Sequence, residues 1–365
     1  MYYITFNDTP SGIYQSQVID VVTYLSHLGD VEVKLIAFLP YSNFKENKKK
    51  IKMQLPSAVV FPIFLGITRW RMLKPLLKII TKKGEVTICR GPIATELALG
   101  SFRKVVYDGR AAVKAEVEEF NVTGNKQLGV DFIKAEKNAV LQSDYRIAVS
   151  NKLVDYWEKE FGYQVDKHIV IPCTLASKSS GELLMNKNDD SIKLVFSGGT
   201  GAWQSIDFVA NLCRKAMKEN ATINVLFLTK ENRVLADFIK EFPDRCERKW
   251  LKHEEVFNEL SECDYGILIR EQNVTNQVAS PVKFAEYLNA GLKVLISGNL
   301  GDFSEFVKEN ACGIVIEDEI PELISVSPSE KKRLNEIANQ YFYKNSEKIK
   351  SSYFKMLKSL SELDK

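Results

Sequence analysis

The stretch ASPVKFAEYLNAGLKVLI, residues 279–296, reads as a helix joined to a buried strand by a tight turn. Ser280 and Pro281 are typical of a helix start, because Ser can cap free backbone N–H groups and Pro has no N–H to leave unbonded. The apolar run Lys293–Ile296 predicts a strand, and Tyr265–Ile269 predicts another strand before the helix. A strand, a helix and a second strand in this order predict a parallel βαβ unit.

The same alternation extends over most of the chain. Short apolar runs predict strands in the first half at Tyr2–Phe6, Val31–Phe38, Ala58–Phe61, Val86–Cys89, Val105–Tyr107, Arg146–Val149 and Ile169–Ile171. In the second half they predict strands at Lys193–Phe196, Asn224–Leu228, Tyr265–Ile269, Lys293–Ile296 and Gly313–Ile316. Strands that are apolar on both faces are typical of parallel sheets covered by helices. We therefore expect an α/β fold of two Rossmann-like, doubly wound parallel-sheet domains that face a central cleft.

The domain boundaries follow from length and composition. A chain of 365 residues exceeds the usual size of one hydrophobic core. The polar stretch Ser177–Asp190 is typical of a linker between domains. We expect an N-terminal domain at 1–175, a linker at 176–190, a C-terminal domain at 191–328, and C-terminal helices at 329–365 that pack back toward the N-terminal domain.

Composition excludes several classes of protein. The hydrophobic fraction is 45% and the charged fraction 27%, which are ordinary values for a globular chain. No apolar run is long enough to cross a bilayer, and Met1–Phe6 lacks the features of a secretory signal. The six cysteines are scattered without a C-x-x-C pair, and the three histidines form no cluster, so neither disulfides nor a metal site is expected. A net charge of +3 does not indicate nucleic-acid binding. We expect a cytoplasmic protein.

The helix start within residues 279–296 suits an anionic ligand. The segment Ser280, Pro281 and Val282 would lie at the positive end of the helix dipole, where the free backbone N–H groups of the first turn face a ligand, and Lys283 adds a point charge. The carboxylate of Glu286, about one turn on, could accept hydrogen bonds from a ribose diol. The simpler alternative is an ordinary capped helix whose Lys and Glu are solvated, and the pattern alone leaves both interpretations open.

Two glycine-containing loops follow predicted first strands. The segment after Leu194–Phe196 contains Gly198, Gly199, Thr200 and Gly201, and such a turn lets backbone approach a phosphate closely. The loop from Asp8 to Gln17 contains Gly12 and Ile13. Each loop could equally be a tight turn between a strand and a helix.

The 279–296 segment resembles the donor-binding helix of GT-B glycosyltransferases, particularly the large family-four (group 1) set of retaining enzymes. Glu286 matches the second glutamate of the family's pair, and 290–294 match its turn into the next strand, with Lys293 in place of the usual proline. Val278 stands where the first glutamate would fall. The pattern S-P-x-K-x-x-E-Y-L also resembles a subset of bacterial surface-polysaccharide enzymes, with Arg270 in the place of that subset's strand-end arginine.

The resemblance implies an enzyme that moves a sugar from a nucleotide diphosphate-sugar to a glycan or lipid-linked saccharide, with retention and without a metal or other cofactor. It implies catalytic roles for Glu286, Lys283 and Arg270. It also implies that the donor contacts the glycine turn Gly198–Gly201, the helix start Ser280–Val282 and the loop that carries His253. It further implies an acceptor side formed by Gly12, Ile13, Arg90, Asp108 and Arg110. Asp108 and Arg110 could alternatively form a buried ion pair that only shapes their loop.

Two other functions fit the same architecture. A sugar-nucleotide epimerase would need acid and base groups, which the scarcity of histidine disfavours. A non-catalytic sugar-nucleotide-binding partner of another transferase fits the missing carboxylate at Val278. The basic and apolar segment from Ile67 to Lys83 suggests an anionic membrane surface as a further partner, at which the protein would be peripheral on the inner face. An ordinary surface helix explains that segment equally well.

Overall fold

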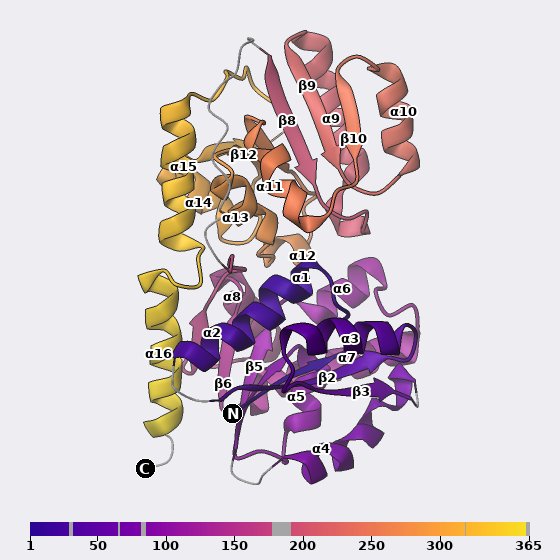
Figure 1. Ribbon diagram of the computed structural model, residues 1–365, viewed down its shortest axis with the longest axis vertical. Helices are drawn as coiled ribbons and strands as arrows, with labels where there is room; N and C mark the ends of the chain where they lie inside the picture. Colours follow the sequence, from indigo (N-terminus) through magenta and orange to yellow (C-terminus); the bar gives the residue numbers. More distant parts are fainter. Residues whose placement is uncertain (29–31, 65, 82–84, 177–190, 318, 363–365) are drawn as a thin grey trace. The chain divides into compact units, whose positions relative to one another are not determined.

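The computed structural model describes residues 1–28, 32–64, 66–81, 85–176, 191–317 and 319–362. It divides into two compact units, which are described separately (Figure 1). Unit 1 comprises Met1–Ala176 with Glu347–Lys365, and unit 2 comprises Ser177–Ser346. Most of the predicted linker, residues 177–190, lies outside the described residues.

Unit 1 is built on a parallel sheet with the strand order β3-β2-β1-β4-β5-β6-β7. Its strands are β1 (Tyr2–Phe6), β2 (Lys34–Pro40), β3 (Val59–Ile63), β4 (Val86–Arg90), β5 (Lys104–Gly109), β6 (Tyr145–Ala148) and β7 (His168–Val170). The chain runs outward from β1 to β3 and then returns to β4, so the order reverses beside β1. In a doubly wound sheet, loops at such a switch point form the crevice where ligands bind.

Helices cover both faces of this sheet (Figure 1). They are α1 (Gly12–Tyr14), a π-helical turn η1 (Gln15–Ile19), α2 (Asp20–Leu28), α3 (Phe44–Gln54), a 3-10 segment η2 (Ile67–Leu73), α4 (Lys74–Ile80), α5 (Pro92–Ala98), α6 (Val113–Phe120), α7 (Lys126–Gln142), α8 (Asn151–Phe161) and α16 (Glu347–Glu362). One hydrophobic cluster joins the sheet to α2, α3 and α16, and a second joins it to η2, α4, α5 and α7. Each cluster buries one face of the strands, which explains why the strand sequences are apolar throughout.

Unit 2 repeats this plan with six parallel strands in the order β10-β9-β8-β11-β12-β13. The strands are β8 (Ile192–Ser197), β9 (Ile223–Leu228), β10 (Cys246–Lys249), β11 (Tyr265–Leu268), β12 (Lys293–Ser297) and β13 (Gly313–Ile316). The helices are a 3-10 turn η3 (Ala202–Gln204), α9 (Ile206–Glu219), α10 (Arg233–Glu241), α11 (His253–Ser261), α12 (Val274–Gln277), α13 (Val282–Asn289), α14 (Phe303–Asn310) and α15 (Pro328–Tyr341). The order reverses between β8 and β11, so the loops after these two strands flank the switch point of this sheet.

Strand β10 is the one element of the sheets that the sequence patterns missed. Its residues, Cys246–Lys249, are mostly polar, and only Cys246 is buried. The strand lies at the edge of its sheet and pairs only with β9. Its other side has no neighbouring strand, so its residues need not be apolar.

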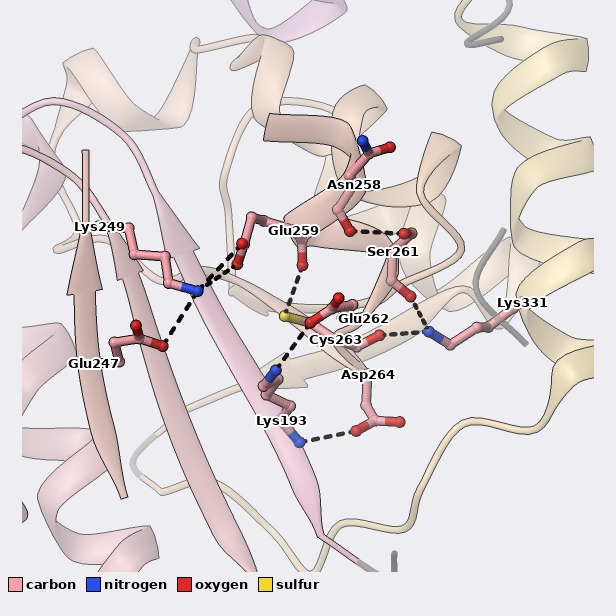
Figure 2. Close-up of polar contacts among 10 residues, drawn as sticks. All are labelled: Lys193, Glu247, Lys249, Asn258, Glu259, Ser261, Glu262, Cys263, Asp264 and Lys331. Carbon is pink, nitrogen blue, oxygen red and sulfur yellow. Dashed lines mark hydrogen bonds and ion pairs between the residues drawn. The ribbon is translucent and has the colours of Figure 1, made fainter. Parts of the chain in front are cut away.

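The two C-terminal helices belong to different units. We expected both to return to the N-terminal domain; α16 does pack on β7 in unit 1, whereas α15 packs on α13 in unit 2. A buried lysine holds α15 in place, since the Nζ atom of Lys331 donates hydrogen bonds to the carbonyl oxygens of Ser261 (2.6 Å) and Cys263 (2.8 Å) (Figure 2). Asp264 continues this network, as its carboxylate accepts from the backbone N–H of Lys193 at 2.8 Å.

Candidate active site

A buried arginine occupies the switch point of unit 2. Arg270 follows β11 and is only 8% exposed. Its Nη1 donates to Asn276 Oδ1 and its Nη2 to Gln204 Oε1, both at 3.3 Å. Its Nε is buried without a hydrogen-bond partner, and no ion pair involving Arg270 is found in the described part of the chain. Burial therefore lowers the pKa of the guanidinium to about 10.

The backbone around Arg270 is fixed by a serine of the neighbouring strand. The Oγ of Ser297, the last residue of β12, accepts from the N–H of Arg270 at 2.5 Å and donates to its carbonyl oxygen at 2.8 Å. Gly266 in β11 lets the ring of Tyr287 lie against the strand, since a Cβ at Gly266 would come within 2.3 Å of that ring. These contacts hold a cation at the carboxyl edge of the sheet without supplying an anion for it. A buried charge in this state is costly unless a ligand neutralises it.

The predicted glycine turn lies beside this arginine. Gly198–Gly201 follow β8 directly and lead into η3, which supplies the Gln204 side chain that meets Arg270. Gly201 packs under the indole of Trp203, where a Cβ would come within 2.7 Å. A Cβ at Gly199 would meet no atom within 4 Å, so the turn presents open backbone there. The turn is therefore suited to close approach by a phosphate.

Helix α13 is anchored by its aromatic residues. The hydroxyl of Tyr287 accepts from the N–H of Ser197 at 2.8 Å and donates to the carbonyl oxygen of Ile267 at 3.3 Å. Phe284 stacks on Phe303 with a centroid separation of 4.2 Å. These contacts fix the rotation of the helix about its axis and leave Lys283 and Glu286 partly exposed.

Lys283 and Glu286, the predicted phosphate and ribose ligands, lie on α13 and pair with each other. The Nζ of Lys283 lies 2.5 Å from Glu286 Oε2, and the two side chains are 25% and 16% exposed. Their i, i+3 spacing brings them together on the helix surface. A ligand that binds the ammonium group of Lys283 must therefore displace the carboxylate of Glu286.

The predicted cap of this helix is wrong by one residue. Pro281, not Ser280, stands at the N-cap, with φ −67° and ψ 125°, and Val282 is the first helical residue. Ser280 lies before the cap and is buried. The extended conformation at Pro281 makes it the boundary residue, and its missing N–H reduces the number of donors at this helix start.

Two further residues named from the sequence fall near this edge. Val278 is 3% exposed and forms the C-cap of α12, so the position where the family's glutamate is expected is an apolar, packed one. His253 is the first residue of α11, and its side chain lies outside the part that the structure describes.

In unit 1 the residues that the sequence predicts for an acceptor side take part in two ion pairs at the carboxyl edge. Arg90, at the end of β4, donates from Nε to Asp8 Oδ2 at 2.8 Å. Arg110 lies 2.8 Å from Asp108 Oδ1, measured from its Nε, and the hydroxyl of Tyr3 donates to the same carboxylate at 2.6 Å. Burial lowers the pKa of Arg110, but Asp108 more than offsets this and raises it above the usual value. Asp108 and Arg110 thus form a buried ion pair in this structure.

Gly12 and Ile13 open α1 at the same edge. Ser11 caps the helix, its Oγ accepting from the N–H of Tyr14 at 3.1 Å. Gly12 is exposed, and the Ile13 side chain is 56% exposed. Both residues are thus available at the surface of unit 1.

Sequence reasoning missed the neutral groups around Arg270. Gln204 and Asn276 accept hydrogen bonds from the guanidinium, and Ser297 holds the backbone of Arg270, yet none of the three belongs to a recognisable motif. The available signal was their position, because each lies in a segment that ends or follows a predicted strand beside the switch point.

Solved structures similar to the whole chain share this two-sheet architecture. The sucrose-phosphate synthase of Thermosynechococcus elongatus is 11% identical, with 100% of each chain covered and a TM-score of 0.67. A mutant of Staphylococcus aureus TarM in complex with fondaparinux, alpha-GlcNAc-glycerol and UDP is 10% identical, with 99% of this chain and 96% of that chain covered and a TM-score of 0.62. The chain has the GT-B fold.

The GT-B fold of this chain is also similar to that of a UDP-GlcNAc 2-epimerase from Neisseria meningitidis bound to UDP-GlcNAc. That enzyme is 12% identical, with 99% of this chain and 100% of that chain covered and a TM-score of 0.54. No family model and no curated protein matches the sequence. Among the described residues, no helix is both long and apolar enough to cross a membrane.

Proposed function

We propose that this protein is a glycosyltransferase that takes a sugar from a nucleoside diphosphate sugar. The observation that carries the proposal is Arg270, a buried cation without a carboxylate partner in the described structure, beside an open glycine turn at the switch point of unit 2. Such a site needs an anion, and a diphosphate bound against backbone N–H groups supplies one. TarM, which has the same fold, was solved with UDP and alpha-GlcNAc-glycerol together.

In this proposal the residues of unit 2 act on the leaving group. The bond between the anomeric carbon and the phosphate oxygen breaks, and negative charge accumulates on the nucleoside diphosphate. Arg270 and the backbone of Gly198–Gly201 stabilise that charge. Lys283 also stabilises it once its ammonium group has left Glu286 and binds the phosphate. The acceptor hydroxyl forms the new bond to the anomeric carbon and gives its proton to the leaving phosphate oxygen, so the configuration is retained and no protein nucleophile is used. Glu286 orients the ribose.

The acceptor proposed for this reaction is a glycan or a lipid-linked saccharide that binds unit 1. The surface of η2 and α4 supports membrane association, because Met72 and Ile79 are 60% and 80% exposed among the exposed cations Arg69, Arg71 and Lys78. Trp70, which could have served as an interfacial anchor, is instead buried. Co-sedimentation with phosphatidylglycerol vesicles should exceed that with phosphatidylcholine vesicles and should fall in an Ile79→Ser variant. Equal recovery with both lipids would exclude the proposed association with an anionic membrane surface.

A substrate panel tests the transferase proposal. The protein is incubated with nucleoside diphosphate sugars, with and without saccharide acceptors, and products are separated by mass. Transfer that depends on the acceptor supports the proposal, whereas a new sugar nucleotide formed without acceptor would identify an epimerase. Binding of a sugar nucleotide without turnover on any acceptor would favour a non-catalytic partner.

An arginine substitution ties the activity to the proposed site. Arg270→Met should weaken nucleoside diphosphate binding by roughly ten- to a hundredfold, because hydrogen bonds to a charged group are lost. Arg214→Met is the matched control, since Arg214 pairs at the surface with Glu241 at 2.6 Å. Equal affinity in wild type and Arg270→Met would refute the assignment of this site.

A further inference from the structure

The backbone of Glu271, the residue after Arg270, is fixed on both sides by hydrogen bonds. Its N–H donates to Ser205 Oγ at 3.0 Å, and its carbonyl oxygen accepts from Asn276 Nδ2, also at 3.0 Å. Asn276 holds both residues at once, because its Oδ1 accepts from the guanidinium of Arg270 at 3.3 Å. The position of Glu271 is therefore tied to that of the buried cation.

Ser205 makes its contact with Glu271 from a strained conformation. Its φ is 52° and its ψ is 45°, in the left-handed region that a residue with a side chain occupies at a cost. Ser205 is only 7% exposed. Strain of this kind persists where the surrounding structure enforces it, and it is concentrated at functional sites. The segment after the glycine turn thus fixes Glu271 through Ser205, as it fixes Arg270 through Gln204.

The carboxylate of Glu271 takes no part in these contacts. The residue is exposed, and no hydrogen bond or ion pair of its side chain is found in the part of the chain that the structure describes. It does not neutralise Arg270, although the two residues are adjacent. A free carboxylate on a rigid backbone suits a ligand contact, because little freedom of the backbone is lost when the ligand binds.

The ligand group that Glu271 can bind follows from its charge and its place. A carboxylate accepts hydrogen bonds, and it repels phosphate. Consecutive Cα atoms lie about 3.8 Å apart, so Glu271 begins one residue away from Arg270, the proposed phosphate ligand. In a nucleoside diphosphate sugar, the hydrogen-bond donors next to the terminal phosphate are the hydroxyl groups of the transferred sugar.

We propose that Glu271 accepts hydrogen bonds from hydroxyl groups of the transferred sugar and so selects the sugar of the donor. The inference rests on the proposed function for the class of its ligand. Glu271 lies seven positions before Val278, where the resemblance places a glutamate, so the resemblance does not make this assignment. A neutral, hydroxyl-bearing sugar fits the contact, whereas a carboxylate on the sugar at this place would be repelled.

Binding measurements on the full chain test this contact without an acceptor. Isothermal titration calorimetry is carried out with UDP, GDP, UDP-glucose, UDP-N-acetylglucosamine and GDP-mannose. Glu271→Ala removes the proposed hydrogen-bond acceptor from an exposed position. Glu219→Ala is the matched control, because Glu219 is an exposed glutamate at the end of α9 in the same unit. Helix α9 begins near the glycine turn and runs back toward the start of β9, so its last residue lies far from Glu271.

The wild type and Glu219→Ala should bind a nucleoside diphosphate and at least one of its sugars with equal affinity. Glu271→Ala should bind that sugar nucleotide at least about tenfold more weakly, because hydrogen bonds to a charged group are lost. Its affinity for the nucleoside diphosphate alone should not fall, since no contact to phosphate is removed.

Three results would overturn the inference and leave the proposed function standing. They are an unchanged affinity of Glu271→Ala for the sugar nucleotide, an equal loss of affinity for the diphosphate and its sugar, and a wild type that binds a diphosphate but none of its sugars. A wild type that binds no nucleotide of the panel would refute the proposed function, and this inference with it.

Discussion

Replacing Glu116 by Gln is expected to stabilise unit 1, and to do so more at pH 8 than at pH 5. Burial raises the pKa of Glu116 from the ordinary 4.5 to about 7 in the folded protein. A raised carboxyl pKa means that the folded state binds more protons than the unfolded state between these two values, so its contribution to stability falls as pH rises through that window. Gln resembles the neutral acid in shape and hydrogen bonding but carries no charge to bury.

The size of the effect follows from the pKa difference. Each pKa unit corresponds to about 1.4 kcal/mol, so the penalty removed at pH 8 is about 3 kcal/mol, falling to about 1 kcal/mol at pH 5. For a unit of this size, 1 kcal/mol changes the melting temperature by about 2–4 °C. The variant should therefore melt roughly 6–12 °C above wild type at pH 8, with a smaller gain at pH 5.

The assay is thermal unfolding followed by circular dichroism at both pH values, with Glu118→Gln as the control. Glu118 is largely exposed and its ion pair with Lys114 is long, at 3.9 Å, so its substitution should change stability by about 0.5 kcal/mol or less. Burial also raises the pKa of Glu136, to about 8. This residue is present in all variants, so its contribution to the pH dependence largely cancels when their melting temperatures are compared. A Glu116→Gln variant that melts with wild type at pH 8, or whose gain is larger at pH 5, would refute the reasoning.

Three other measurements test separate parts of the structure. Tyr287→Phe should lower the stability of unit 2 by about 1–3 kcal/mol in urea denaturation, because the N–H of Ser197 loses its acceptor; an unchanged midpoint would show that this hydrogen bond does not stabilise the unit. Lys331→Met should cost about 1–3 kcal/mol by leaving the carbonyl oxygens of Ser261 and Cys263 without their donor, and a variant as stable as wild type would show that α15 needs no such contact. Sugar transfer should persist in EDTA, as expected when side chains and backbone stabilise the leaving diphosphate, and an absolute requirement for added Mg²⁺ would exclude that mechanism.

The sheets were predictable from the sequence because burial on both faces demands apolar residues along every central strand. All seven strands of unit 1 and five of the six in unit 2 follow such runs, to within a few residues at each end. Strand β10 does not, because an edge strand with partly exposed side chains needs no apolar pattern. Apolar runs in the sequence therefore predict every strand except β10, whose polar composition follows from its place at the edge of the sheet.

The site was only partly predictable. Arg270 and the Gly198–Gly201 turn could be placed because each follows a strand that borders the switch point of the sheet. The partners of Arg270 could not, since Gln204 and Asn276 meet it through the folding of two separate loops. The spacing of three residues between Lys283 and Glu286 allows the two side chains to pair on the helix surface, but residue types alone do not distinguish this pairing from a separate ligand contact for each.

A crystal structure of the protein with a bound nucleoside diphosphate tests the central claim most directly. The account predicts a phosphate oxygen within about 3 Å of the Arg270 guanidinium, with further phosphate contacts to the backbone of Gly198–Gly201. A nucleotide bound elsewhere on the chain, with Arg270 still surrounded only by Gln204 and Asn276, would contradict it.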